Sequence, residues 1–228
     1  MKNKTDTATW DKYRLILSAF FNWCAEEGRQ YVKSNILHRR KEFYGEPNRT
    51  KEIRYYTEKE IAKLFEYLDS HYPAIKSTFF KTLAYTGLRL SELINLKWSA
   101  VNLRRKEISI VGNTKSRRKR YIPVSPNLMS LLKSLPSDNE YVFDNGHNEP
   151  MLTGWAWYKI LKSALGKCGI KGGNIHTFRH TFASHLVMSG VDLSSVQKLL
   201  GHSRIETTSI YSHLSPGHLK STIEKLPY

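Results

Sequence analysis

Hydrophobic residues along the chain recur mainly with the period of an α-helix. In Trp10–Cys24 and in Ile61–Leu68 they fall three or four positions apart, which puts them on one helical face. The segment from about Ala74 to Tyr85 is apolar on most sides, so it is expected to be a central helix. A further helix is expected from about Thr153 to Leu165. The residues expected on its inner face are Trp155, Tyr158, Leu161 and Leu165.

Polar residues at the ends of these segments predict where helices begin and end. Thr57 and Glu60 have the spacing of a capping box. Ser91 is placed to cap a short helix. Closer to the C-terminus, Asp192 is placed to cap a helix that Gly201 ends. A last short helix is then expected to carry Tyr211.

One region has the alternating pattern of strands. Ile108 and Ile110 alternate with polar residues, and Glu107–Val124 is expected to form a hairpin whose turn holds Gly112. A short strand is expected at Tyr141–Phe143. The expected fold class is therefore mainly α with a small antiparallel β-sheet (α+β).

A polar and basic stretch, Arg39–Arg54, interrupts the helical pattern. It contains Gly45 and Pro47 and has the composition of a linker. We therefore expect two parts, a helical segment with this basic linker over residues 1–50 and a larger domain over residues 51–228.

The overall charge indicates a polyanionic partner. The chain has 36 Lys and Arg against 20 Asp and Glu, a formal net charge of +16, which points to nucleic acid or an anionic membrane surface. No run of about eighteen apolar residues occurs, so the membrane alternative is the weaker one. The two cysteines, Cys24 and Cys168, form no CxxC motif and fit a reducing cytosol. The residues expected to contact DNA are Arg39, Arg40, Lys41, Arg117, Arg118, Lys119 and Arg120. For the linker residues among them, contact with solvent alone is the alternative.

Residues spread along the sequence supply what a phosphodiester transfer without a metal requires. A nucleophile has to attack phosphorus, donors have to neutralise the equatorial oxygens, and an acid has to protonate the leaving oxygen. A tyrosine nucleophile forms a covalent phosphoester, which conserves the bond energy for rejoining. The candidates are Tyr211, Arg89, Arg179, His176, His202 and Lys115.

The motifs TGLRLSEL, a lysine on a hairpin, HTFRHTFAS and LLGHSRIETTSIYSHL occur in this order. They resemble those of the tyrosine recombinases, also called the phage integrase family, from Thr57 to the end of the chain. The resemblance implies a site-specific DNA recombinase that works through a 3′-phosphotyrosine, with no metal, ATP or other cofactor. It implies double-stranded DNA with inverted-repeat sites as partner, a homo-tetramer on DNA, a free monomer and accessory DNA-bending proteins. It also implies a cytoplasmic location, at the bacterial nucleoid when bound to DNA.

By position, the resemblance makes Tyr211 the nucleophile and makes Arg89 and Arg179 the two phosphate clamps. His176 would accept the tyrosine proton and donate to the developing oxyanion. His202 would take the position at which the family has His or Trp.

Three further assignments concern the neighbours of these residues. The resemblance makes Lys115 the acid for the 5′ oxygen, although Lys119 lies in the same hairpin and shares its charge. It makes Glu92 a structural support of the site. His176 and His180 have the spacing of half a zinc site, but no Glu or Cys stands nearby in the right pattern. His180 is therefore expected to cap, pack or face solvent.

The front of the chain departs from the family pattern. Members usually carry a helical core-binding domain of four or more helices, whereas residues 1–50 offer one long helix and the segment YVKSNILH. We expect a truncated or minimal version of that domain. The tail Ser215–Tyr228 is expected to pack on a neighbouring protomer or to fold back on its own domain. Two other functions stay open, namely a type IB topoisomerase and a non-catalytic DNA-binding regulator with the same fold.

Overall fold

The computed structural model describes residues 7–37, 53–111, 119–145, 147, 149–151 and 154–215. The chain divides into two compact units, Met1–Glu52 and Ile53–Tyr228. Several residues singled out in the sequence lie outside the described residues, namely Arg39, Arg40, Lys41, Lys115, Arg117 and Arg118, together with nearly all of the C-terminal tail.

The first unit is built on helix α1 (Thr7–Ala25), as the spacing of apolar residues predicted. The chain after the helix folds back on it through Asn35. The amide nitrogen of Asn35 lies 2.9 Å from the Ser18 carbonyl oxygen and 2.8 Å from Asn22 Oδ1. Large apolar side chains such as Leu15 and Ile16 stay exposed. The described part of this unit therefore leaves much of the apolar surface of α1 uncovered.

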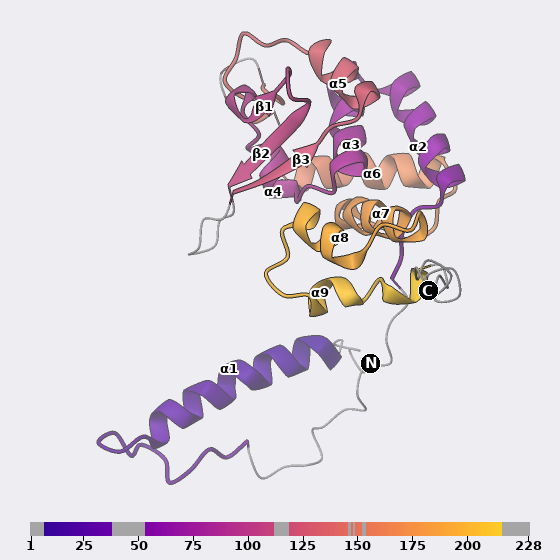
Figure 1. Ribbon diagram of the computed structural model, residues 1–228. Helices are drawn as coiled ribbons and strands as arrows, with labels where there is room; N and C mark the ends of the chain where they lie inside the picture. The colour runs from indigo at the N-terminus through magenta and orange to yellow at the C-terminus, as the bar shows by residue number, and fades with distance from the viewer. Residues whose placement is uncertain are drawn as a thin grey trace, which may run out of the picture. The chain divides into compact units, whose positions relative to one another are not determined.

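The second unit is mainly helical and has one small sheet, as the sequence predicted (Figure 1). Its long helices are α2 (Glu58–His71), α3 (Ala74–Thr86), α6 (Gly154–Lys167) and α7 (Ile175–Met188). Its shorter helices are α4 (Leu90–Ile94), η2 (Trp98–Ala100), α5 (Pro126–Lys133), α8 (Leu193–Leu200), α9 (Glu206–Ser209) and η3 (Ser212–Leu214). Its strands are β1 (Val101–Asn102), β2 (Glu107–Val111) and β3 (Lys119–Pro123).

The sheet is antiparallel, with the order β1-β2-β3. The predicted hairpin is confirmed, because β2 pairs with β3 and places Ile108 opposite Ile122. The strand predicted at Tyr141–Phe143 is wrong. Tyr141 forms a single bridge to Lys97, and the next two residues form a turn, in which the Val142 N–H donates to the Leu96 carbonyl oxygen at 2.8 Å. Val142 and Phe143 are buried in the core, so hydrophobic burial rather than strand pairing explains their apolar character.

Most predicted helix ends are confirmed. The Thr57 hydroxyl accepts a hydrogen bond from the Glu60 N–H, and the Glu60 carboxylate accepts one from the Thr57 N–H, at 3.3 and 2.9 Å. Gly201 adopts a φ of +67° after α8, a conformation that costs glycine no side-chain clash. The cap predicted at Ser91 is wrong. Arg89 takes the N-cap position of α4, because its N–H binds the Glu92 carboxylate at 2.9 Å.

The main core lies between the long helices, α5 and the sheet. Helix α3 is central, as predicted, and its Phe79 ring stacks on Trp157 of α6 with centroids 3.5 Å apart. The predicted inner face of α6 is half right. Leu161 and Leu165 are buried, but Trp155 is 64% exposed. Tyr158, also predicted to face inward, is exposed and stacks on Trp155. Residues 157, 161 and 165 follow the helical repeat, which leaves Trp155 and Tyr158 on another face.

A second cluster of buried residues forms where α7 meets α8 and the segment after it. It contains Ala183, Val187, Val196, Leu200 and Tyr211. In Figure 1, α8 and α9 lie below α7, and α8 also meets strand β3, where Arg120 donates to the Leu199 carbonyl oxygen. No helix within the described ranges is both long and apolar enough to cross a bilayer.

Candidate active site

Arg179 lies at the centre of the candidate site and is almost completely buried, at 2% exposed. Its Nη1 donates to the Gly87 carbonyl oxygen at 2.7 Å and its Nη2 to the Leu200 carbonyl oxygen at 2.6 Å. These carbonyls close α3 and α8, where the helix dipole favours a cation. Burial lowers the pKa of Arg179 to about 10, so the guanidinium stays charged at neutral pH.

Arg89 stands beside it at the start of α4 and shares a carboxylate with a second arginine. Arg89 Nη1 lies 3.0 Å from Glu92 Oε1. Arg120 of β3 binds both oxygens of Glu92, at 2.9 and 2.7 Å. The Arg120 and Glu92 side chains are only 11% and 10% exposed, whereas Arg89 is 42% exposed. Glu92 therefore links the side chains of Arg89 and Arg120.

The sequence placed Arg120 among the DNA contacts, and the structure gives it another place. Besides binding Glu92, its Nε donates to the Leu199 carbonyl oxygen at 3.1 Å. All three nitrogens of the guanidinium thus have partners inside the protein. Lys119, next to it at the start of β3, is exposed, and its Nζ lies 5.2 Å from the centroid of the Tyr121 ring.

Burial of the Glu92 carboxyl by itself would raise its pKa. The hydrogen bonds from Arg120 and from the Arg89 N–H outweigh this effect and hold the pKa of Glu92 below its usual range. Glu92 is therefore ionised at neutral pH, and it offsets part of the positive charge of the two arginines.

His202 follows α8 and lies among these cations. Its Nδ1 lies 2.8 Å from the hydroxyl oxygen of Thr208, which is fully buried. Burial and the charges of Arg179 and Arg89 lower the pKa of His202 to about 4, so the ring is neutral at pH 7. Among the described residues, His202 Nδ1 is the hydrogen-bond partner of the Thr208 hydroxyl. When Thr208 donates to Nδ1, the neutral ring carries its hydrogen on Nε2. Nε2 is then the atom that can donate to a bound oxyanion.

His176 lies at the start of α7, and its side chain is exposed. The protein around its ring, together with the charges of Arg179 and Arg89, lowers its pKa. The two arginines thus act on both His176 and His202. The structure gathers Arg89, Arg179, His176 and His202 at one place, as the sequence predicted.

Tyr211 lies between α9 and η3 rather than within a helix, and it is 1% exposed. Its phenolic oxygen lies 2.7 Å from His180 Nδ1. Burial raises the pKa of Tyr211 to about 12, although the charge of Arg179 works in the opposite direction. The phenol is therefore protonated at neutral pH and lies next to the site without facing solvent.

His180 is the residue that the sequence analysis missed. The sequence predicts only that His180 caps, packs or faces solvent, and the resemblance assigns the tyrosine proton to His176. The two rings lie edge to face with centroids 5.0 Å apart, but it is His180 that binds the phenol. Its place one residue after Arg179, on the helix that carries the site, was the available signal. Which residue of α7 meets Tyr211 depends on how the end of the chain packs.

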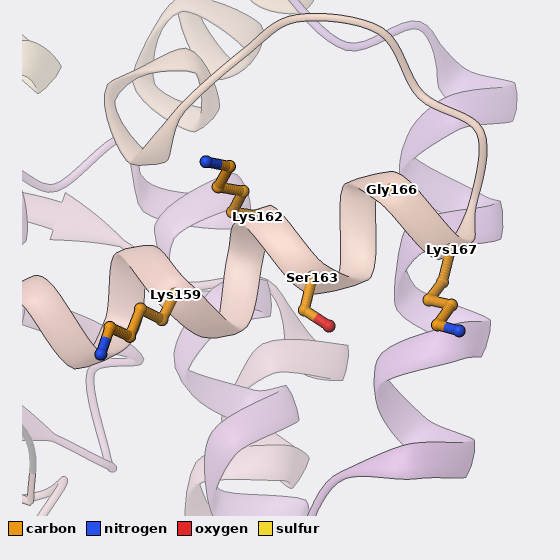
Figure 2. Close-up of a pocket in the computed structure, with 5 residues that line it drawn as sticks. All are labelled: Lys159, Lys162, Ser163, Gly166 and Lys167. Atoms are coloured by element: carbon orange, nitrogen blue, oxygen red, sulfur yellow. The ribbon is translucent and has the colours of Figure 1, made fainter.

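Outside this site, the polar side chains of the described residues bear on two further kinds of site, a metal centre and an anion pocket. Among the described residues, no group of three His, Cys, Asp or Glu side chains is placed to hold a metal ion. A shallow depression on α6 is lined by Lys159, Lys162, Ser163, Gly166 and Lys167 (Figure 2). The three lysine side chains extend in different directions from the helix, so they make a basic surface rather than an anion pocket.

Comparison with known proteins agrees with this arrangement. The pattern of the phage integrase family matches residues 54–218, which include every candidate site residue of the second unit. The chain belongs to this family. The tyrosine recombinase XerA of Pyrococcus furiosus is 34% identical over 176 residues, which cover 74% of this chain and 60% of the relative. The tyrosine recombinase of Thermosipho africanus is 31% identical over 226 residues, covering 96% of this chain and 76% of the relative.

The chain thus spans less than two thirds of the length of several relatives that it matches, XerA among them. The catalytic domain of bacteriophage HP1 integrase is 28% identical, with a TM-score of 0.63 over 77% of this chain and 96% of that domain. The XerH recombinase bound to a palindromic difH substrate is 23% identical, with a TM-score of 0.77 over 98% of this chain and 69% of XerH. These structures confirm the fold class predicted from the sequence, which is mainly α with a small antiparallel sheet.

Proposed function

We propose that the protein is a site-specific DNA recombinase, an enzyme that integrates or excises DNA by cleaving and rejoining strands through a 3′-phosphotyrosine. The Tyr211 oxygen attacks a backbone phosphorus, the bond from phosphorus to the 5′ oxygen breaks, and the phosphate stays on the tyrosine. A 5′ hydroxyl then attacks the phosphotyrosine, releases Tyr211 and restores the phosphodiester. The bond energy is kept throughout, so neither ATP nor water takes part in the exchange.

One observation carries this proposal. Arg89 begins α4, whereas His176 and Arg179 lie on α7, yet all three lower the pKa of the His202 ring that follows α8, and Arg179 also acts on the Tyr211 phenol. Positive charge and neutral donors are thus concentrated beside one phenol. Such an arrangement stabilises the charge that develops on the equatorial phosphate oxygens of the transition state.

The remaining roles follow from the same chemistry. Lys115, which lies outside the described residues, is the proposed acid that protonates the 5′ oxygen. Lys119 is the alternative acid from the same hairpin. The proton of the Tyr211 phenol passes to a neutral imidazole, for which the resemblance favours His176.

The buried state of Tyr211 sets a requirement for this mechanism. A reacting oxygen has to approach phosphorus to about 3–3.5 Å, which a side chain that is 1% exposed cannot do. The nucleophile therefore has to be uncovered when DNA binds. Arg179 is buried to a similar degree, whereas the Arg89 side chain is 42% exposed. The phosphate therefore either approaches from the side of Arg89 or binds after the residues that cover Arg179 and Tyr211 have moved.

The partners that fit are double-stranded DNA with inverted-repeat sites and further copies of the chain. Exposed Lys119 and the lysines of α6 add basic surface for the phosphate backbone. We propose a monomer that assembles into a tetramer on DNA, with accessory DNA-bending proteins, in the bacterial cytoplasm at the nucleoid. The first unit is proposed to belong to a core-binding segment.

The test is covalent trapping on nicked DNA. Fragments of the DNA that flanks the gene, nicked near candidate cleavage positions, should give a covalent protein–DNA adduct. The adduct should disappear in Tyr211→Phe, whose ring has nearly the same shape but no nucleophile. Arg89→Ala should lower the rate about a hundredfold, the scale of losing one oxyanion donor. An adduct that persists in Tyr211→Phe would refute the role of Tyr211.

Plasmid relaxation and DNA binding, measured alongside the trapping experiment, separate the alternatives. Relaxation of plasmids that carry no specific site, without pairing of DNA sites, would indicate a type IB topoisomerase. Site-specific binding without an adduct on any nicked fragment would indicate a regulator, a function that the burial of Tyr211 also fits.

A further inference from the structure

The contact between His180 and Tyr211 has no part in the chemistry described so far. The His180 Nδ1 and the Tyr211 phenolic oxygen are 2.7 Å apart, although the residues are 31 positions apart in the sequence. Among the described residues, His180 is the hydrogen-bond partner of this phenol. The ring of Tyr211 lies in the apolar cluster formed by residues such as Val196 and Leu200.

The state of both groups makes the contact a favourable one. Burial, His176 and Arg179 lower the pKa of His180 to about 4, so its ring is neutral at pH 7 and has a nitrogen free to accept. The phenol keeps its proton and can donate it. A buried hydroxyl without a partner would be costly, so His180 allows Tyr211 to stay inside the apolar cluster.

Resting on the proposed role of Tyr211 as nucleophile, we propose that His180 is a positioning residue that holds the phenol in a docked position. The phenol has to leave His180 before it can reach a phosphate, because in the docked position it is covered. The segment that carries it can rearrange locally, since Tyr211 lies between the four-residue helix α9 and the three-residue helix η3.

Two substitutions of His180 distinguish holding from proton transfer. His180→Leu removes the acceptor and keeps an apolar side chain. His180→Asn keeps a group that can bind the phenol but cannot take up a proton at neutral pH. The matched control is His185→Leu, because His185 lies on the same helix, is also half-buried and faces Tyr55 instead of Tyr211.

The first measurement needs no DNA. Nitration of Tyr211 by tetranitromethane, followed by peptide mass spectrometry, reports how often the phenol is exposed. The exposed Tyr121 of the same molecule serves as internal reference. Loss of one hydrogen bond should raise the nitration rate of Tyr211 about two- to tenfold in His180→Leu. The rate should stay near that of the wild type in His180→Asn and in His185→Leu.

The second measurement is adduct formation on nicked DNA. His180→Leu should form the adduct at least as fast as the wild type, because the phenol is released more often. Unchanged nitration in a folded His180→Leu protein would overturn the proposal. Loss of the adduct in both His180→Leu and His180→Asn would overturn it as well, since His180 would then act in proton transfer. If Tyr211→Phe still formed an adduct, the proposed nucleophile would be wrong, while the nitration result would still report on the contact.

Discussion

The ion pair between Arg120 and Glu92 allows a quantitative prediction. We consider Arg120→Met, which keeps an unbranched side chain of similar reach and removes the charge. Both partners are nearly buried, and the substitution deletes two hydrogen bonds to Glu92 and one to the Leu199 carbonyl oxygen. Glu92 keeps Arg89, both through the guanidinium and through the backbone N–H.

The size of the effect follows from what remains unpaired. Removing one partner of a buried ion pair typically costs about 3–5 kcal/mol, because the other charge stays buried without compensation. Since Arg89 still compensates part of the Glu92 charge, we expect a loss of about 3 kcal/mol in the free energy of unfolding at pH 7. This is far above the roughly 0–1 kcal/mol of an exposed ion pair.

The pH dependence has a definite sign. Arg120 helps to hold the pKa of Glu92 below its usual range, so the ion pair contributes stability above the unfolded pKa of about 4.3. That contribution is lost as the pH falls through the folded pKa. The difference between wild type and Arg120→Met should therefore be large at pH 7 and should shrink at about pH 3.

Urea denaturation of the wild type, Arg120→Met, Glu92→Gln and the double variant measures the coupling between the two residues. Arg120→Lys is the conservative control, because it keeps the charge but loses the planar two-point contact. A loss below about 1 kcal/mol at pH 7 would place the pair among ordinary surface contacts and refute the reasoning. A loss of equal size at both pH values would refute the assigned role of the Glu92 charge.

The remaining predictions concern the neighbours of this pair. Thr208→Val should shift the ¹⁵N signals of His202 toward a mixture of tautomers, whereas Thr208→Ser should leave them unchanged; equal spectra for both variants would contradict the donor role of Thr208. A methyl group at Gly201 would lie 2.9 Å from Arg120 Cδ at a φ of +67°. Gly201→Ala should therefore lower the free energy of unfolding by about 1–3 kcal/mol in urea titrations, and no measurable loss would argue against this close approach. His180 and His202 have folded pKa values of about 4. Stability should thus be full above about pH 6.5 and fall toward pH 4, by about 1–2 kcal/mol for each ring because both rings are partly screened by solvent, and a flat profile would contradict their neutral state.

The local parts of the fold were determined by the sequence alone. The hydrophobic period of α2, the capping box at Thr57 and the end of α8 at Gly201 all depend on residues within one or two turns of each other. Helix geometry and hydrogen bonding at helix ends act over that range. Charge excess and the order of the motifs likewise needed no coordinates, and they led to the right family.

The errors also have local explanations. Trp155 looked like a core residue because it is large and apolar, but its neighbour Trp157 is the one that faces Phe79. Ser91 is a good capping residue by type. The helix nevertheless begins two residues earlier, with Arg89 as the N-cap, because the Glu92 carboxylate accepts a hydrogen bond from the Arg89 N–H. A pattern of residue types predicts that a helix begins in this region, and packing decides at which residue.

Only the tertiary structure decided which distant side chains meet. Arg120 and Glu92 are 28 positions apart, and His180 and Tyr211 are 31 apart. Nothing in the sequence distinguishes Arg120, which turns inward to a carboxylate, from Lys119, which stays exposed. The same holds for the burial of Tyr211, which comes from the packing of α7 against α8 and the segment after it. Residue type fixes the charge, size and hydrogen-bonding capacity of a side chain, whereas its partner, its exposure and its pKa depend on the arrangement of distant elements.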